Sequence, residues 1–251
     1  MDPDSDARKP VALVVGAGDY IGAAIARRFA REGYVACLGR RRGDQAKPLA
    51  DEIVAAGGEA HAFGLDAREE SQVVELVDRI EREIGPLEVV VFNVGANVNF
   101  PIRETTTRVF TKVWQMACLA GFLTGREAAR VMAPRRKGTI LFTGATASLR
   151  GGAGYAAFAS AKSGLRALAQ SMARELGPEN LHVAHVVIDA GVDTAWVRER
   201  IEQSTGRRVD QLPEDTLVDP DSIAELYWFL HRQPRDAWSF EVDLRPAIEK
   251  W

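Results

Sequence analysis

Apolar residues along the chain follow two patterns, short unbroken runs and longer stretches with helical spacing. The short runs predict strands at 11–15, 34–38, 59–64, 87–92, 138–143, 181–188 and 237–244. The longer stretches predict helices at 23–31, 45–56, 69–84, 107–132, 153–176 and 220–231. Alternating strands and helices are typical of a parallel sheet covered on both faces. We therefore expect an α/β fold, a Rossmann-type doubly wound parallel sheet in a single domain.

The segment 192–217 has neither pattern, because it is polar and charged. We interpret it as a mobile flap that closes over a substrate. No repeat, low-complexity run or linker divides the 251 residues, and α/β domains often reach this length. The domain is therefore expected to span 1–251.

Composition and charge argue against several classes of protein. A net charge of −3 gives no reason to expect a nucleic-acid or membrane-surface partner. The polar start, MDPDSDARKP, has no apolar signal region, and no apolar run approaches the roughly 18 residues that span a bilayer. Cys37 and Cys118 stand in apolar surroundings, and the four histidines lack metal-ligand spacing. We expect a cytoplasmic protein without a bound metal.

A glycine-rich run, VGAGDYIG at residues 15–22, follows the first predicted strand and leads into the first helix. Backbone N–H groups at a helix N-terminus favour an anion, and glycine lets the backbone approach it closely. In a doubly wound fold this loop holds the phosphates of a dinucleotide. The residues expected to bind them are Gly16, Gly18, Tyr20, Ile21 and Gly22.

The end of the second strand reads Leu-Gly-Arg-Arg-Arg at residues 38–42 and contains no carboxylate. A carboxylate there would bind the ribose 2′-hydroxyl of NAD, whereas an arginine receives the 2′-phosphate of NADP. We therefore expect NADP(H) rather than NAD(H), with Arg40 as the first phosphate ligand and Arg41 as the second.

Residues 142–165, FTGATASLRGGAGYAAFASAKSGL, join a predicted strand to a long predicted helix. This stretch resembles the catalytic segment of the short-chain dehydrogenase/reductase family. That family uses a Ser, a later Tyr, and a Lys one helical turn after the Tyr. Lys162 matches the Lys, but Phe158 stands in the Tyr position and Ala145 in the Ser position. The family's Asn in the preceding helix falls at Ala117 or Cys118, depending on how the helix is aligned.

The resemblance extends over about residues 10–244. Gly16 and Gly22 match the family fingerprint Thr-Gly-x-x-x-Gly-x-Gly, whereas Val15 and Tyr20 depart from it. Four further positions follow strands as they do in the family. They are Asp66, where the family contacts adenine, Asn93 and Gly95 in a run resembling Asn-Asn-Ala-Gly, and Thr194, where the family contacts the nicotinamide carboxamide. Asp189 and Ala190 replace the family's usual Pro-Gly.

The resemblance implies that Lys162 binds the nicotinamide ribose and supports catalysis. Phe158 has no hydroxyl and cannot transfer a proton, so the proton must come from elsewhere. Tyr155, Thr146 or a bound water are the candidates, with Tyr155 about two helical turns from Lys162. Asp189 is either an unusual acid or base, or a residue that caps the flap.

Two functions are compatible with this pattern. The first is an NADP(H)-dependent oxidoreductase acting on a carbonyl, an alcohol or an activated double bond by an atypical proton-transfer route. The alternative is a catalytically silent NAD(P)-binding protein that serves as a sensor, scaffold or partner subunit. A lyase or isomerase using Asp189 is a third possibility. The resemblance also implies a homodimer or homotetramer acting on a small molecule.

Overall fold

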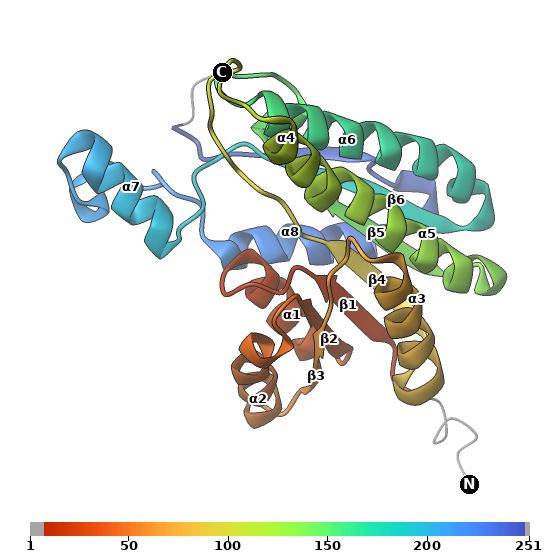
Figure 1. Cartoon of the computed structure of the whole chain (residues 1–251). Helices are drawn as coiled ribbons and strands as arrows, with labels where there is room; N and C mark the ends of the chain where they lie inside the picture. The colour runs from red at the N-terminus through yellow and green to blue at the C-terminus, as the bar shows by residue number, and fades with distance from the viewer. Residues whose placement is uncertain (1–7, 249–251) are drawn as a thin grey trace, which may run out of the picture.

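The computed structural model describes residues 8–248; residues 1–7, which contain most of the polar start, and 249–251 lie outside this range. Within residues 8–248, seven strands form one sheet in the order β3-β2-β1-β4-β5-β6-β7, and each neighbouring pair is parallel. The strands are β1 Val11–Val15, β2 Val35–Arg40, β3 Glu59–Gly64, β4 Leu87–Phe92, β5 Gly138–Thr143, β6 Leu181–Ile188 and β7 Glu241–Leu244. The predicted parallel α/β sheet is confirmed (Figure 1).

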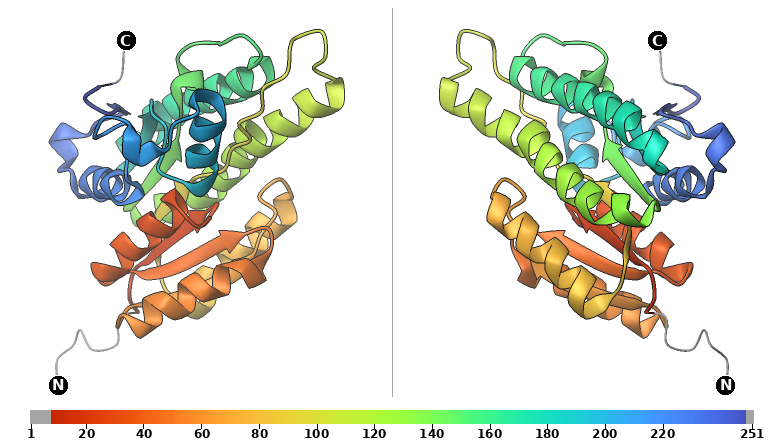
Figure 2. Two further views of the ribbon diagram at one scale, coloured as in Figure 1. Left: turned by 90° about the vertical axis from the view of Figure 1, so that its left-hand side faces the viewer. Right: turned by 90° about the vertical axis from the view of Figure 1, so that its right-hand side faces the viewer.

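Helices cover both faces of this sheet (Figures 1 and 2). They are α1 Ile21–Arg31, α2 Lys47–Ala55, α3 Glu70–Arg79, α4 Thr107–Trp114, α5 Ala120–Met132, α6 Ala156–Leu176, α7 Ala195–Thr205 and α8 Pro220–Arg232. One apolar core lies between the sheet and α1, α2 and α8. The other lies between the opposite face and α3, α5 and α6. Both cores are needed because the central strands are apolar on both sides.

Several boundaries differ from those that the sequence predicts. The predicted helix 107–132 is interrupted by a π-helical turn, Gln115–Leu119, and 69–84 ends in another, Ile80–Ile84. The last strand is short because Arg235–Ala237 forms a 3₁₀ turn before it. Helix α7 lies inside the segment read as an irregular flap, and it has no buried residue, so no apolar face marks it in the sequence.

The order of the strands determines where the candidate site lies. From β1 the chain proceeds outward to β2 and β3, then returns to pair β4 on the other side of β1. Connections therefore leave β1 and β4 in opposite directions, which opens a crevice beyond the carboxyl ends of these strands. Within residues 8–248 no helix is long and apolar enough to cross a membrane.

Candidate functional site: two adjoining pockets at the carboxyl edge of the sheet

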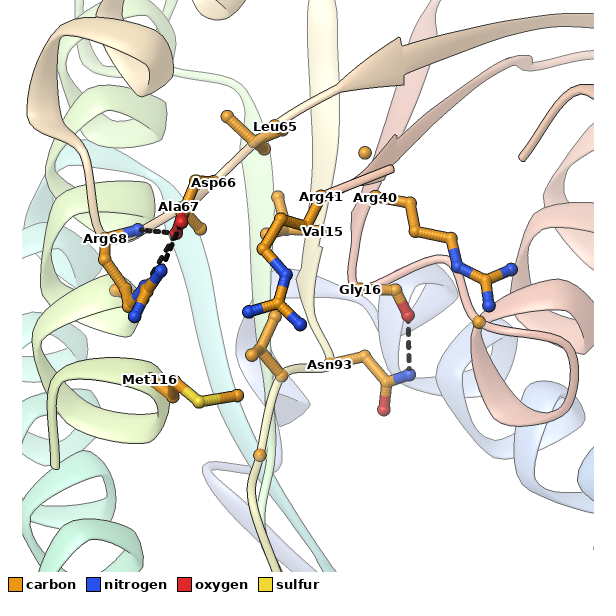
Figure 3. A pocket seen from close by; sticks show the side chains of 15 residues that line it. Val15, Gly16, Arg40, Arg41, Leu65, Asp66, Ala67, Arg68, Asn93 and Met116 are labelled. Atoms are coloured by element: carbon orange, nitrogen blue, oxygen red, sulfur yellow. Dashed lines mark hydrogen bonds and ion pairs between the residues drawn. The ribbon is translucent and has the colours of Figure 1, made fainter. Parts of the chain in front are cut away.

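A groove of about 330 Å³ opens where the strand order reverses (Figure 3). We call it the glycine groove. It is lined by Val15, Gly16, Gly18, Gly39, Arg40, Arg41, Leu65, Asp66, Ala67, Arg68, Asn93, Val94, Gly95, Met116 and Ala120. Seven of the residues predicted to bind a cofactor are thus brought together, namely Gly16, Gly18, Arg40, Arg41, Asp66, Asn93 and Gly95.

Two glycines of the loop after β1 have no room for a side chain. Gly16 has a φ of +89°, and a Cβ there would lie 2.5 Å from the carbonyl oxygen of Asn93. A Cβ on Gly22 would collide with the carbonyl of Gly16, so α1 begins directly against the loop. The Asn93 amide donates to that same carbonyl at 3.1 Å. Gly18, by contrast, faces open space on the groove side. This compact loop at a helix N-terminus suits a phosphate group.

The two arginines at the end of β2 differ in what they contact. Arg40 donates to the Asp19 carboxylate at 2.7 Å and to the carbonyl of Gln45 at 3.2 Å. The guanidinium of Arg41 extends into the middle of the groove (Figure 3). Both positions fit a 2′-phosphate, but Arg40 would share its charge with Asp19. The predicted order, with Arg40 first, stays a prediction.

Asp66 lines the groove but is already paired. The Arg68 side chain donates to both of its carboxylate oxygens, and the Arg68 backbone N–H lies 3.2 Å from one of them. These hydrogen bonds with Arg68 hold the pKa of Asp66 below its ordinary value, so it is a carboxylate at neutral pH. Its predicted contact with adenine would have to coexist with this ion pair.

Tyr20 connects the loop to the flap across the sequence. Its hydroxyl accepts a hydrogen bond from the backbone N–H of Ala195 at 3.0 Å. Ala195 opens α7, and the preceding residue, Thr194, caps that helix by accepting from the N–H of Val197 at 3.1 Å. Tyr20 and Ile21 stand at the start of α1 rather than along the groove. The glycine loop and the flap are therefore joined by the side chain that departs from the family fingerprint.

Lys162 is buried beneath the groove. Its ammonium donates to the carbonyl of Thr143 at 2.7 Å and to the carbonyl of Val94 at 3.2 Å. A Cβ on Gly95 would lie 3.4 Å from its Nζ, which places the ammonium next to the groove wall. Burial lowers the pKa of Lys162 to about 8, because the charged form is deprived of water.

A second pocket, of about 350 Å³, opens at the start of α6. We call it the α6 pocket. It is lined by Asn97, Ala145, Thr146, Ala147, Arg150, Gly151, Gly152, Tyr155, Phe158, Ile188 and Ala190. The hydroxyl-bearing candidates Thr146 and Tyr155 thus share one cavity with Phe158, whose ring centroid lies 6.0 Å from the Lys162 Nζ.

Asp189 lies behind the α6 pocket and is almost wholly buried. The Thr146 hydroxyl donates to its carboxylate. The carboxylate is also 3.5 Å from the Arg150 guanidinium and 3.3 Å from that of Arg245. The sequence pattern singled out Asp189 and Thr146 but not the two arginines. Arg150 belongs to the stretch 142–165, but its position in the sequence did not indicate a contact with Asp189.

The structure also places the two candidates for the Asn position. Ala117 and Cys118, the candidates for the Asn position, are both buried in the π-helical turn between α4 and α5. The Cys118 sulfur lies against Gly164 of α6, since a Cβ there would be 3.0 Å from it. Among residues 8–248, no three His, Cys, Asp or Glu side chains are grouped as ligands for a metal.

These features define a class of protein. The site has a glycine loop at a helix N-terminus, a groove at the strand-order reversal and a buried ammonium at the far end of that groove. Together these features fit a nicotinamide dinucleotide. The site is thus that of a dinucleotide-binding α/β protein.

Comparison with known proteins identifies the family. Residues 10–205 match the family model described as short chain dehydrogenase. The chain is 31% identical over 212 residues to the uncharacterized oxidoreductase YxjF of Bacillus subtilis (strain 168), covering 84% of this chain and 81% of that protein. The chain belongs to the short-chain dehydrogenase family, whose members are NAD(P)-dependent oxidoreductases.

Solved structures agree with this assignment. A short-chain dehydrogenase from Rhodopseudomonas palustris is 52% identical, with a TM-score of 0.81 over 95% of this chain and 99% of that one. An actinorhodin polyketide ketoreductase with NADPH is 22% identical but has a TM-score of 0.87 over 97% of this chain and 98% of that one, and so shows the same fold. That Phe158 and Ala145 occupy the family's catalytic positions stays a prediction.

We expect Tyr20→Phe to loosen the start of α7 while leaving the sheet intact, because only the hydrogen bond to Ala195 is lost. A hydrogen bond of this kind contributes about 1 kcal/mol, so amide hydrogen exchange at Ala195 should rise about fivefold. Ser204→Ala is a matched control, since its hydroxyl bonds the carbonyl of Ile201 within α7. Unchanged exchange in Tyr20→Phe would show that the contact does not restrain the flap.

We expect the stability of the cofactor-free protein to depend on pH through Lys162. The folded pKa of about 8 lies below the ordinary value of 10.5, so above about pH 8 the unfolded chain binds more protons and stability rises with pH. Relative to Lys162→Met, the wild type should gain about 2 kcal/mol between about pH 7 and pH 9.5. Denaturant unfolding at both pH values measures this. Lys112→Met, which removes an exposed lysine, should show no such change.

Proposed function

We propose that this protein is an NADP(H)-dependent oxidoreductase that acts on a carbonyl, an alcohol or an activated double bond. The observation that carries the proposal is the arrangement around Lys162. The glycine groove lies on one side of its ammonium and the α6 pocket, through Phe158, on the other. A cofactor lying in the groove would therefore reach the mouth of a cavity suited to a small molecule.

The preference for NADP(H) rests on Arg40 and Arg41. Both line the glycine groove at the end of β2, where NAD-specific proteins carry a carboxylate. Relatives of known structure do not decide between the cofactors. A metagenomic short-chain oxidoreductase is described in complex with NADP, and a xylitol dehydrogenase is described as NAD⁺-bound. The arginines of this chain are the reason to favour NADP(H).

A bound nicotinamide would supply or accept the hydride, and the chain must then handle one proton. Thr146 is the favoured relay, because its hydroxyl lines the α6 pocket and is hydrogen-bonded to Asp189. In alcohol oxidation Thr146 would take the proton of the substrate hydroxyl while passing its own to the Asp189 carboxylate. Reduction would follow the reverse path. Tyr155 is a second candidate, since it lines the same pocket.

The alternative function is a catalytically silent NAD(P)-binding protein acting as a sensor, scaffold or partner subunit. It is favoured by the apolar character of Phe158 and Ala145, which together leave part of the α6 pocket without a hydroxyl. A lyase or isomerase that uses Asp189 has less support, because that carboxylate is buried and shared by Thr146 and two arginines.

A homodimer or homotetramer, located in the cytoplasm, remains part of the proposal. Three aromatic side chains on neighbouring helices α4 and α5 are exposed to solvent in the single chain: Phe110, Trp114 and Phe122. Aromatic residues exposed in this way are common in contacts between subunits.

The cofactor proposal is tested by calorimetric titration with NADPH and NADH. We expect NADPH to bind at least about tenfold more tightly, because the 2′-phosphate gains charge-assisted hydrogen bonds. Arg41→Gln and Arg40→Gln should each weaken NADPH binding about tenfold and leave NADH binding unchanged. Arg42→Gln is the control, since Arg42 is exposed and does not line the groove. Equal affinity for both cofactors would overturn the preference.

Whether the lack of hydroxyls at positions 158 and 145 limits activity is tested by the double variant Phe158→Tyr with Ala145→Ser. A Tyr hydroxyl introduced one helical turn before Lys162 should add general-acid catalysis, which is worth about a hundredfold or more. The rate of NADPH consumption with a panel of aldehydes and ketones should therefore rise in this double variant. The rate should not rise in the control variant, Phe158→Leu with Ala145→Ser. If NADPH binds normally but neither the wild type nor the double variant consumes it, the silent-protein alternative is favoured.

A further inference from the structure

The α6 pocket has an uneven distribution of polar groups. Its wall is largely apolar, formed by alanines together with Phe158 and Ile188. Hydroxyls enter from Thr146 and Tyr155, and an amide enters from Asn97. Among the described residues that line it, Arg150 is the only one with a charged side chain. A cavity of this kind selects a ligand that is mostly apolar but carries a group able to pair with a guanidinium.

Arg150 is available to a ligand. Its side chain is 55% exposed, and its one ion pair within residues 8–248 is the contact of 3.5 Å with Asp189. That separation is long for a charge-assisted hydrogen bond, and no side-chain hydrogen bond of Arg150 is formed within the described chain. A planar guanidinium carries several N–H donors, so most of them remain for water or a ligand.

Asp189 does not cancel the charge of Arg150 inside the pocket. Its side chain is only 4% exposed, and its carboxylate is shared with Thr146 and with Arg245, which is itself 13% exposed. Arg245 also pairs with Asp243 of β7, which does not line the α6 pocket. Asp189 therefore neutralises Arg150 only in part, and the exposed guanidinium can meet an incoming molecule.

The Asp189 carboxylate also sets the distance between the two ligand contacts, one at Thr146 and one at Arg150. Thr146 donates to one oxygen of Asp189, and Arg150 faces the other oxygen. The Arg150 backbone N–H also donates to the carbonyl of Thr146 at 3.1 Å, so both residues belong to one turn of chain. A ligand oxygen at Thr146 and an anionic group at Arg150 would therefore be separated by only a few bonds.

We propose that the α6 pocket binds a substrate carrying a carboxylate or similar anionic group, held by Arg150, a few bonds from the carbonyl or hydroxyl that reacts at Thr146. The substrate class is then a short oxo or hydroxy acid with an apolar remainder. A guanidinium matches a carboxylate through two parallel hydrogen bonds, which gives orientation as well as affinity. This inference rests on the proposed oxidoreductase function, because it assigns the substrate of the same pocket.

The test compares benzoylformate with its methyl ester, which share the ring and the oxo group and differ in charge. Each is titrated calorimetrically into protein saturated with NADP⁺, so that no reduction takes place. We expect benzoylformate to bind at least about tenfold more tightly than the ester. Arg150→Gln should remove this difference, and Arg150→Lys should retain part of it. Arg174→Gln, an exposed arginine towards the far end of α6, should leave it unchanged.

Equal affinities for the two probes, or a preference that persists in Arg150→Gln, would overturn the proposal. Failure of both probes to bind would overturn it as well. The titration is repeated without cofactor on protein carrying Arg40→Gln and Arg41→Gln, so that the glycine groove cannot hold the anion. If benzoylformate is still preferred in that protein and the preference depends on Arg150, the anion site is supported even when NADP⁺ does not bind. Failure of NADP⁺ to bind would contradict the proposed function and not the anion site.

Discussion

The hydrogen bonds of one buried ammonium join the parts of this site. Lys162 reaches from α6 to the carbonyl of Thr143, at the end of β5, and to the carbonyl of Val94, just beyond β4. A buried charge is costly unless it is hydrogen-bonded, so these carbonyls must stay where the ammonium can meet them. The ends of two central strands and the start of a long helix are thereby held in one arrangement. Both pockets open beside that arrangement.

Most of the polar groups around the α6 pocket come from loops rather than from α6 itself. The α6 side, where the family resemblance places a tyrosine, presents Phe158. The loop after β5 and the end of β6 instead present Thr146, Arg150 and the buried Asp189. Thr146 and Arg150 both contact the Asp189 carboxylate, which is almost wholly buried. Apart from the Tyr155 hydroxyl at its start, α6 presents Phe158 to the pocket, while the loop after β5 presents the hydrogen-bonding groups that an oxo or hydroxy acid would use.

The side chain of Tyr20 links the glycine loop to the flap by a hydrogen bond. In the family fingerprint a glycine, which has no side chain, stands at this position. Here a tyrosine hydroxyl contacts the first residue of α7, next to Thr194. The resemblance places Thr194 at the nicotinamide, so this hydrogen bond joins two parts of the predicted cofactor site. Helix α7 otherwise projects from the body with no buried residue (Figure 1).

The sequence alone predicted the fold, because apolar runs such as Leu87–Phe92 and Leu181–Ile188 can be buried on both faces only in a covered parallel sheet. It also predicted seven of the residues that line the glycine groove, since the carboxyl ends of parallel strands meet at one edge. Only the tertiary structure revealed α7, the contact of Tyr20 with Ala195, the pairing of Arg40 with Asp19, and the grouping of Arg150 and Arg245 around Asp189. Apart from α7, these are polar contacts between residues far apart in sequence or on irregular loops. Hydrophobic periodicity records which side of an element is buried, and it carries no information about which polar partners meet there.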